Sequence, residues 1–323
     1  MNDSPTTPTL LESLNPSELH TIRRFFPAVT FADGSLLYQQ SELADGCYLI
    51  ESGQVMTFTH MPNIGDVPIG MIGPGDIAGE SVLLSAAPRV QSAKAMGPVS
   101  ALYVDARHLG ILQSLINPLH FEALHALATI FARRMQKLLS FSPVNTDFSN
   151  PDDRGPLGTH EQPGCSFDYE AFMEVLPVFK GFSRAELKYL AGISTPWEIK
   201  RGRYLYVAGE PSESCFITIR GAVEMRYCGQ PQGRRINLLG PGRLVDPLEL
   251  VLGPPRVTEA RARESTVVLS FERRKVAELV QDKHPLAAKC LGAAVHEILT
   301  RLLRANRVLA TNHVAASLGL LGG

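Results

Sequence analysis

The 323-residue sequence has few of the features that mark several functional classes. It contains five cysteines and no CxxC pair, which disfavours a disulfide scaffold and is typical of a reducing compartment. Lysine plus arginine total 31 against 32 aspartate plus glutamate, so a strong overall attraction to nucleic acid is not expected. No apolar run approaches the roughly 18 residues of a membrane span. The N-terminal MNDSPTTPTLLESL lacks the basic and apolar regions of a signal peptide. We therefore expect a cytoplasmic protein without a membrane segment.

Catalytic and metal-binding patterns are also missing from the sequence. It has no GxSxG, no P-loop and no cysteine–histidine pairing typical of a nucleophilic site. The nine histidines do not cluster: His120 and His125 are five residues apart, and His296 falls in a largely apolar segment. This scatter argues against the cupin enzymes, which need a clustered metal site. We expect no catalytic residues, no metal and no cofactor.

The chain contains two copies of one pattern. FADGSLLYQQSELADGCYLIESGQV, residues 31–55, aligns without a gap with IKRGRYLYVAGEPSESCFITIRGAV, residues 199–223. GPGDIAGESVLLSAAPRVQSAKA, which begins at Gly73, aligns with GPGRLVDPLELVLGPPRVTEARA, which begins at Gly240. Such self-similarity at a nearly constant spacing predicts two domains of the same fold.

Each copy predicts a short helix, many short strands and then a long helix. Apolar and polar residues alternate in short runs such as 47–50 and 215–219, and glycines interrupt these runs at turn positions. Many short strands at regular spacing indicate an antiparallel barrel or jelly roll. Helical spacing of apolar residues follows, over 106–115 and 119–141 in the first copy and over 272–281 and 285–310 in the second. The predicted fold class is mainly β with flanking α, as two jelly-roll barrels that each have an N-terminal helix and a long C-terminal helix.

The repeat also sets the expected domain boundaries. We expect a first domain over 10–141 and a second over 169–312. Between them, residues 142–168 include SPVNTDFSNPDDRGPLGTHEQPG, which is rich in Pro, Gly, Asp and Asn. This composition predicts a flexible linker.

One segment of the first copy is suited to binding a sugar phosphate. In AGESVLLSAAPRVQSA, residues 78–93, Gly79 would let the backbone approach a ligand closely. Glu80 is an acceptor suited to a sugar hydroxyl. Arg89, nine residues further on, is suited to pair with a phosphate through a charge-assisted, forked contact.

This segment resembles the phosphate-binding cassette of the cyclic nucleotide-binding domain family, which includes the catabolite activator protein and the regulatory subunits of cyclic AMP-dependent protein kinase. The resemblance covers about residues 10–141 and 177–310. It implies that Glu80 holds the ribose 2′-hydroxyl and that Arg89 holds the cyclic phosphate. The full set of ligand-binding residues that we expect is Ile72, Gly79, Glu80, Ser81, Arg89, Val90 and Gln91. The implied ligand is a cyclic mononucleotide, cyclic AMP before cyclic GMP.

The first cassette departs from the family pattern at positions that bear on the ligand. Val90 stands where many members have a hydroxyl residue or alanine after the arginine. ARRMQ, residues 132–136, resembles the ARRLQ of the catabolite activator protein, yet the adenine-reading Thr-Ser pair of that protein falls on Leu138 and Leu139. The sequence therefore leaves the preferred base open.

The second cassette has lost two of its residues. Asp246 and Pro247 stand at the positions of the glycine and the glutamate, while Arg256 is kept. An aspartate repels a phosphate, and proline lacks a backbone donor. This predicts a domain that no longer binds a mononucleotide in the family's way, with Arg256 as the candidate for a second site. The alternative is a more anionic ligand, such as a cyclic dinucleotide, held by Arg256, Arg261 and Arg263; a solvated strand face is the simpler interpretation.

The resemblance implies a sensor that passes its signal to an effector. A helix-turn-helix would need roughly 60–70 residues after the last helix, and TNHVAASLGLLGG follows residue 310, so direct DNA binding is not expected. Apolar stripes on the two long helices predict a homodimer, unless each stripe covers its own barrel. We expect a cyclic nucleotide receptor that signals through an effector protein and is not an enzyme. The alternatives are a scaffold that has lost ligand binding, and a cyclic dinucleotide-responsive regulator of transcription.

Overall fold

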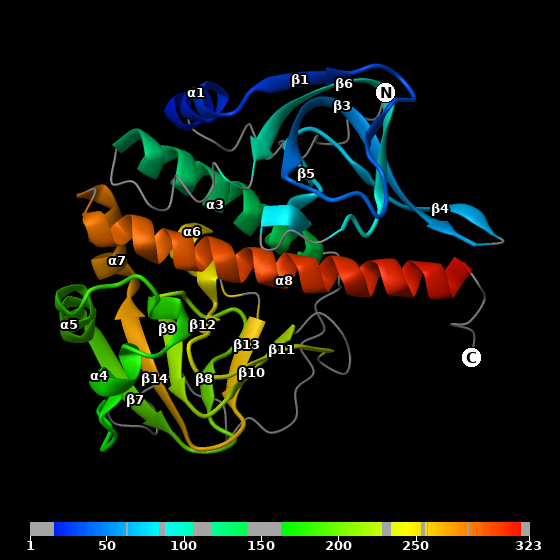
Figure 1. The fold of residues 1–323 in the computed structure, drawn as a ribbon. Coiled ribbons are helices and arrows are strands. Elements are labelled where there is room, and N and C mark those ends of the chain that lie inside the picture. Colours follow the sequence, from blue (N-terminus) through cyan, green and yellow to red (C-terminus); the bar gives the residue numbers. More distant parts are fainter. Residues whose placement is uncertain are drawn as a thin grey trace, which may run out of the picture. The chain divides into compact units, whose positions relative to one another are not determined.

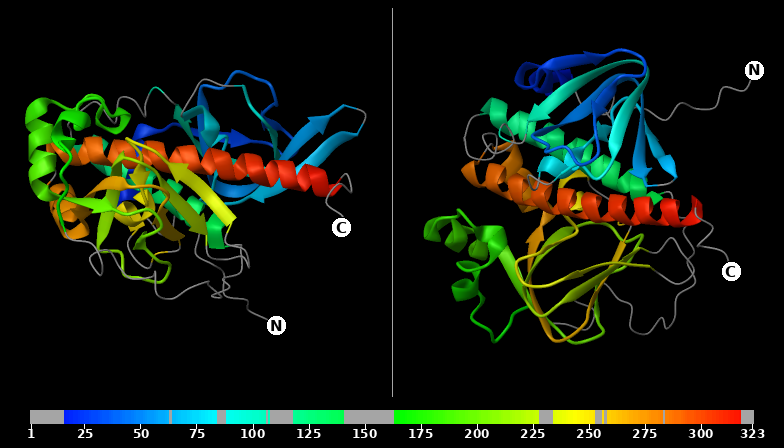
Figure 2. Two further views of the ribbon diagram at one scale, coloured as in Figure 1. Left: turned by 90° about the horizontal axis from the view of Figure 1, so that it is seen from below. Right: turned by 45° about the vertical axis from the view of Figure 1, so that its right-hand side comes forward.

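The computed structural model of the chain describes residues 16–62, 64–83, 88–105, 107, 118–140, 163–227, 234–252, 256, 258–282 and 284–317. The chain forms two compact units, one made of Met1–Arg134 with Ile298–Gly323 and the other of Met135–Glu297. Figure 1 labels their elements, and Figure 2 shows in two further views how strongly the strands curl. No helix among the described residues combines the length and apolar character needed to cross a bilayer.

The first unit is a curled antiparallel sheet preceded by α1 (Pro16–Phe25). Its strands are β1 (Ala28–Phe31), β2 (Leu36–Tyr38), β3 (Gly46–Met61), β4 (Gly65–Ile72), β5 (Ile77–Ala78) and β6 (Ser92–Asp105). The order is β1-β6-β3-β4, with β2 paired to β6 and β5 to β3. The long strands β3 and β6 pair from Gly46↔Asp105 to Phe58↔Ser92, with register shifts near Ser52. Such irregularities bend a strand, which lets the same two strands serve both faces of the roll.

The core of this sheet combines small and aromatic residues. Ala93, Ala95 and Ala101 on β6 are fully buried, and they leave room for the rings of Tyr38 and Tyr48. After the strands, α3 (Pro118–Ser140) buries an apolar stripe that includes Leu124, Leu127, Ile130 and Phe131. Spacings of three and four residues place these side chains on one face of the helix. The helix matches the expected 119–141 to within one residue at each end.

The second unit begins with short helices and contains two four-stranded antiparallel sheets. The helices are α4 (Tyr169–Met173), η3 (Pro177–Phe179), α5 (Arg184–Ile193), α6 (Pro247–Leu252), α7 (Arg273–Gln281) and the first part of α8 (Pro285–Ser317), whose residues from Ile298 onward belong to the first unit. The first sheet has the order β11 (Arg234–Leu239), β10 (Val223–Tyr227), β13 (Thr258–Ala262) and β8 (Tyr204–Tyr206). The second has the order β12 (Leu244–Val245), β9 (Ser214–Arg220), β14 (Thr266–Glu272) and β7 (Ser194–Ile199).

The alternation of side chains along β9 and β14 explains why these strands are apolar on both faces. Phe216 and Val268 point between the two sheets, where they pack with Tyr206 of β8. Ile217 and Leu269, one residue further along each strand, belong to the cluster beneath the helices. Because successive side chains of a strand point to opposite faces, a strand covered on both sides needs an almost continuous apolar run.

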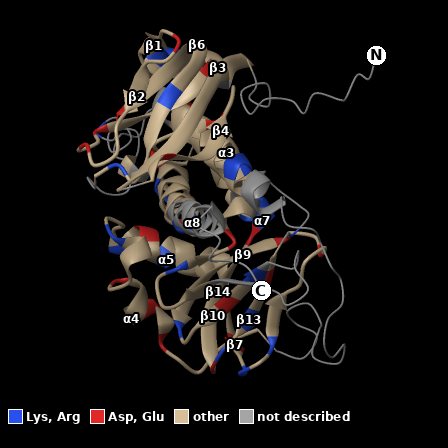
Figure 3. Cartoon of the chain, turned by 90° about the vertical axis from the view of Figure 1, so that its right-hand side faces the viewer, with Lys and Arg blue, Asp and Glu red and all other residues tan. Residues whose placement is uncertain are grey.

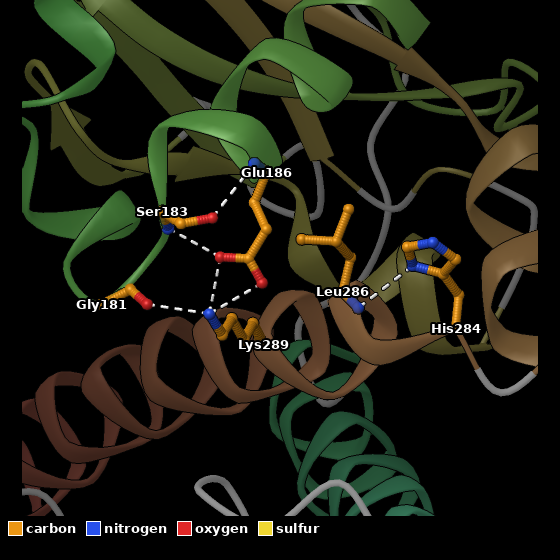
Figure 4. Close-up of polar contacts among 6 residues, drawn as sticks. All are labelled: Gly181, Ser183, Glu186, His284, Leu286 and Lys289. Atoms are coloured by element: carbon orange, nitrogen blue, oxygen red, sulfur yellow. Dashed lines mark hydrogen bonds and ion pairs between the residues drawn. The ribbon is translucent and has the colours of Figure 1, made fainter.

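Helix α5 begins at a capping box formed by Ser183 and Glu186. Ser183 Oγ accepts from the backbone N–H of Glu186, and Glu186 Oε2 accepts from the backbone N–H of Ser183 at 2.6 Å. Lys289 of α8 extends this network: its Nζ lies 2.7 Å from Glu186 Oε2 and 2.8 Å from the carbonyl oxygen of Gly181 (Figure 4). The start of α8 is therefore bound to the N-terminal helices of its own unit.

The predicted fold class, mainly β with flanking helices in two jelly-roll domains, is confirmed, and the described strands form open sheets rather than closed barrels. Helix α8 continues to Ser317, beyond the expected 310, because no glycine or proline interrupts residues 293–317. The predicted linker, 142–168, and the helix predicted over 106–115 fall mainly outside the described residues.

Candidate ligand-binding site

The proposed cassette lies where β5 ends and a short 3₁₀-helix, η1 (Glu80–Leu83), begins. Gly79 joins the two with φ +83°, a left-handed conformation that favours glycine. A Cβ atom at this position would collide with the Arg89 guanidinium and would lie 3.1 Å from the ring of Tyr38. This position therefore needs glycine for its backbone conformation and for the space that it leaves to Arg89.

Arg89 is a buried cation held in one orientation. Its Nη1 donates to the carbonyl oxygen of Gly79 at 2.8 Å and its Nη2 to that of Gly46 at 2.6 Å. Its Cζ lies 4.3 Å from the centre of the Tyr38 ring. Among the residues that the structure describes, no carboxylate lies within ion-pair distance of this guanidinium. Because a buried charge is costly unless it is paired, this environment is suited to receive an anion.

Glu80 pairs with Arg134 of helix α3. Its carboxylate is buried, with Oε1 3.4 Å from Arg134 Nε, and Arg134 Nη1 lies 2.8 Å from Asp76 Oδ1. Burial alone would lower the pKa of Arg134, but the neighbouring carboxylates of Glu80 and Asp76 raise it above its ordinary value. Arg134 therefore stays charged, and it joins the cassette to the long helix.

The other expected site residues have different environments. Ile72, at the end of β4, is buried in the core cluster that includes Tyr38. Val90 is half exposed, and Gln91 is partly buried. Ser81 lies in η1, and its side chain, like those of Leu138 and Leu139, is outside the described part of the structure. The structure thus brings Gly79 and Arg89 into direct contact, with Glu80 adjacent.

Sequence reasoning missed three residues of this site: Tyr38 beneath the guanidinium, Asp76, and Arg134. Tyr38 has a visible signal, because the aligned position in the second copy is also a tyrosine, Tyr206. Burial raises the pKa of Tyr38, and the charge of Glu80 raises it further, so its phenol is neutral beside Arg89. Arg134 lies within the ARRMQ segment, but its partner carboxylates are too far away in sequence for the pairing to be predicted.

The corresponding place in the second domain is occupied differently. Arg256 is buried over the ring of Tyr206, with Cζ 3.8 Å from the ring centre, and its Nη2 donates to the carbonyl oxygen of Ser214 at 2.6 Å. Its Nη1 lies 3.4 Å from Oδ2 of Asp246. Asp246 is itself buried and has φ +61°. The arginine has the same kind of environment as Arg89, with a carboxylate added.

The three arginines considered above for a more anionic ligand each have a different partner. Arg256 pairs with Asp246, Arg261 Nε donates to the carbonyl oxygen of Gly202 at 2.6 Å, and Arg263 Nη1 lies 3.2 Å from Glu224 Oε2. In Figure 3 basic and acidic segments are interspersed along the described strands and helices. The described residues contain no group of three or more His, Cys, Asp or Glu that could hold a metal ion.

Comparison with curated proteins finds partial relatives. The cyclic AMP receptor protein of Thermus thermophilus is 30% identical over 140 residues, which cover 41% of this chain and 62% of that protein. The cAMP-dependent protein kinase regulatory subunit of Blastocladiella emersonii is 33% identical over 88 residues, covering 27% of this chain and 22% of that protein. The chain thus spans less than two thirds of the length of these relatives.

Solved structures to which the chain is similar include regulatory subunits of protein kinase A. The regulatory domain from Toxoplasma gondii, crystallised with cAMP, is 17% identical with a TM-score of 0.32, covering 85% of this chain and 90% of that one. The regulatory subunit of a cAMP-independent protein kinase A from Trypanosoma brucei is 17% identical with a TM-score of 0.33, covering 86% of this chain and 83% of that one.

A family model for the cyclic nucleotide-binding domain matches the chain twice, at residues 28–113 and 196–283. The two matches coincide with the two copies of the internal repeat, and together they cover more than half of the 323 residues. The resemblance noted in the sequence is thereby confirmed. The chain belongs to the cyclic nucleotide-binding domain family, with two such domains in tandem.

Proposed function

We propose that the chain is a cyclic nucleotide receptor whose first domain binds the ligand through Gly79, Glu80 and Arg89, with cyclic AMP as the preferred ligand. The observation that carries this proposal is the environment of Arg89. Its guanidinium is buried, fixed by two carbonyl oxygens and an aromatic ring, and has no carboxylate partner among the described residues. A singly charged cyclic phosphate supplies the anion that this position lacks.

Glu80 supplies the second contact, as acceptor for the ribose 2′-hydroxyl. The residues beside the cassette complete the site: Ile72 forms an apolar wall, and Ser81, Val90 and Gln91 lie along the same segment. Three curated relatives support cyclic AMP as ligand by their names, among them a CRP-like cAMP-activated global transcriptional regulator of Mycobacterium tuberculosis, 26% identical over 96 residues, which cover 30% of this chain and 43% of that protein.

The signal leaves the site through helix α3. Ligand that engages Glu80 competes with Arg134 for its carboxylate, while Asp76 keeps Arg134 at 2.8 Å. Binding therefore shifts the equilibrium between two positions of helix α3 relative to the cassette. The receptor acts in the cytoplasm through an effector protein, and its long helices provide the surface for a homodimer. It neither binds DNA directly nor catalyses a reaction.

Calorimetric titration of the full chain with cyclic AMP, cyclic GMP and a cyclic dinucleotide tests the proposal. Arg89→Ala removes the phosphate partner, and we expect it to cost about 2–5 kcal/mol of binding. Arg107→Ala is the matched control, because Arg107 belongs to the same unit, pairs with Asp105 and has a side chain that is 83% exposed. This control should bind as the wild type does. Chromatography of the recovered nucleotide should show no conversion.

Two results would overturn the proposal. The first is that none of the three nucleotides binds to the wild-type chain, which would favour a scaffold. The second is binding that Arg89→Ala leaves undiminished, which would place the ligand elsewhere. A nucleotide that is consumed during incubation would contradict the non-catalytic part of the proposal.

A further inference from the structure

The carboxylate of Asp246 lies beside Arg256 in the second domain, whereas the first domain has Gly79 at the aligned position. We infer that Asp246 fills the phosphate position of the second domain, so that this domain carries an internal substitute for its ligand and is closed to cyclic nucleotides while Asp246 is present. The inference rests on the proposed function in one respect: the environment of Arg89 is taken as the phosphate site of the first domain.

The two arginines share a tyrosine ring beneath the guanidinium and a carbonyl oxygen that accepts from Nη2. Tyr206 lies beneath Arg256 as Tyr38 lies beneath Arg89. The carbonyl oxygen of Ser214 accepts from Nη2 at 2.6 Å, as that of Gly46 does in the first domain.

The difference concerns the other terminal nitrogen of each guanidinium. In the first domain Nη1 of Arg89 donates to the backbone oxygen of Gly79. In the second domain Nη1 of Arg256 lies 3.4 Å from the carboxylate of Asp246, which aligns with Gly79. A side-chain anion has thus been added at the residue where the first domain keeps glycine.

The backbone at Asp246 retains the conformation of the glycine that it replaces. Its φ is +61°, against +83° at Gly79, and Ser41 is the only other described non-glycine residue with a positive φ. Such a conformation is costly for most residues but is tolerated by aspartate. The turn of the cassette therefore survives in the second domain, and the side chain that grows from it is directed at Arg256.

Burial makes this pair a closed unit. The side chains of Arg256 and Asp246 are only 3% and 1% exposed. Thr258 Oγ1 also lies 3.4 Å from Asp246 Oδ2, and the hydroxyl of Tyr206 lies 3.3 Å from Thr258 Oγ1. An incoming phosphate would have to displace a buried carboxylate of the same charge, and it would meet Pro247 in place of the ribose-binding glutamate.

The test restores the glycine and asks whether an added anion takes the place of the carboxylate. All variants carry Arg89→Ala, which silences the first site: R89A, R89A/D246G, the isosteric control R89A/D246N, and R89A/D246G/P247E. Thermal unfolding is followed with inorganic phosphate or with chloride at equal ionic strength, and circular dichroism verifies folding. Calorimetry with cyclic AMP then measures nucleotide binding.

We expect R89A/D246G to have a lower melting temperature than R89A when both are measured in chloride. Phosphate should restore part of this loss. The R89A parent and D246N, in which the space stays filled, should not respond to phosphate beyond its general salt effect. R89A/D246G/P247E should bind cyclic AMP, whereas R89A should bind none. A D246G variant that folds but responds to neither phosphate nor, with P247E, to cyclic AMP would overturn the inference.

If the D246G variants do not fold, the inference can still be tested with Asp246 in place. If R89A still binds one equivalent of cyclic AMP and Arg256→Ala abolishes that binding, the second site is open and the inference is wrong. Failure of the proposed function is distinguishable, because it appears as absent binding in the wild-type chain. The phosphate response of D246G does not depend on that result.

Discussion

Arg243 stands in the second domain at the position that Asp76 holds in the first, and the two residues carry opposite charges at the same turn. The backbone of this turn is kept: Gly75 N–H donates to Ile50 O and Gly242 N–H donates to Thr218 O. Asp76 pairs with Arg134 of α3, whereas Arg243 pairs with Glu297 of α8 through two contacts of 2.9 and 3.0 Å. In each domain an ion pair thus joins this turn to a long helix that follows it. The turn supplies the carboxylate in the first domain and the guanidinium in the second.

This reversed pair predicts a non-additive effect on stability. Arg243→Leu leaves Glu297, whose side chain is 6% exposed, without its bidentate partner. We expect a loss of about 3 kcal/mol in the free energy of unfolding. Arg243→Leu combined with Glu297→Leu should recover part of it, because two apolar side chains can replace a partly buried ion pair. Urea unfolding measures both, and a double variant less stable than either single one would contradict this.

Gly79 and Gly97 form a matched pair for separating backbone strain from ligand binding. Both have positive φ, +83° and +86°, but a Cβ at Gly97 would meet nothing within 4 Å, whereas one at Gly79 would strike Arg89. Alanine at either position should cost about 1 kcal/mol of stability through its backbone conformation, and at Gly79 the collision with Arg89 adds to this cost. Gly79→Ala alone should also weaken cyclic AMP binding at least tenfold. Equal affinities of the two variants in calorimetry would disprove the role of Gly79 as the residue that makes room for Arg89.

The ion pair of Glu186 and Lys289 predicts an acid-sensitive component of stability. Burial would raise the pKa of Glu186, but hydrogen bonds from Lys289 and Ser183 outweigh it and hold the pKa below the ordinary value of 4.5. Because the folded-state pKa is lowered, the stabilisation is fully present above pH 4.5 and is lost as the pH falls through the folded-state value. Glu186→Gln should flatten this part of the pH profile in urea unfolding. An unchanged profile would exclude the pair as its source.

Cys290 is expected to resist alkylation in the folded chain. Burial, followed by the negative charge of Glu186, raises the pKa of this thiol to about 12. At pH 8 only about one molecule in ten thousand then carries the reactive thiolate. Mass spectrometry after iodoacetamide treatment should find Cys290 modified far more slowly than Cys165, although both residues are partly exposed. Comparable rates at the two positions would contradict the pKa argument; urea should abolish the difference.

The features that depend on short segments of sequence were predictable. The capping box at Ser183 follows from two residues three positions apart, and the two-domain organisation follows from the repeat. The carboxylate partners of Arg134 were not predictable, because they are 54 and 58 positions away and meet it only after α3 packs on its unit. The burial of Asp246 against Arg256 was also missed, because an alignment shows the lost glycine but not the direction of the new side chain.

Several expectations from the sequence stay predictions. The ligand-binding roles of the cassette residues, the preferred base, the homodimer and the effector depend on measurements with ligand and partner. The positions expected to contact the base, Leu138 and Leu139, have side chains outside the described residues.

The internal pair of Asp246 and Arg256 has a consequence for the lifetime of the protein in the cell. A domain whose buried arginine is matched by its own carboxylate keeps its stability whatever the supply of nucleotide. A domain that awaits an external anion gains RT ln(1 + [L]/Kd) only when ligand is present. We therefore expect starvation for the nucleotide to expose the first domain to proteases before the second, so that the same small molecule that carries the signal also protects its receptor from turnover.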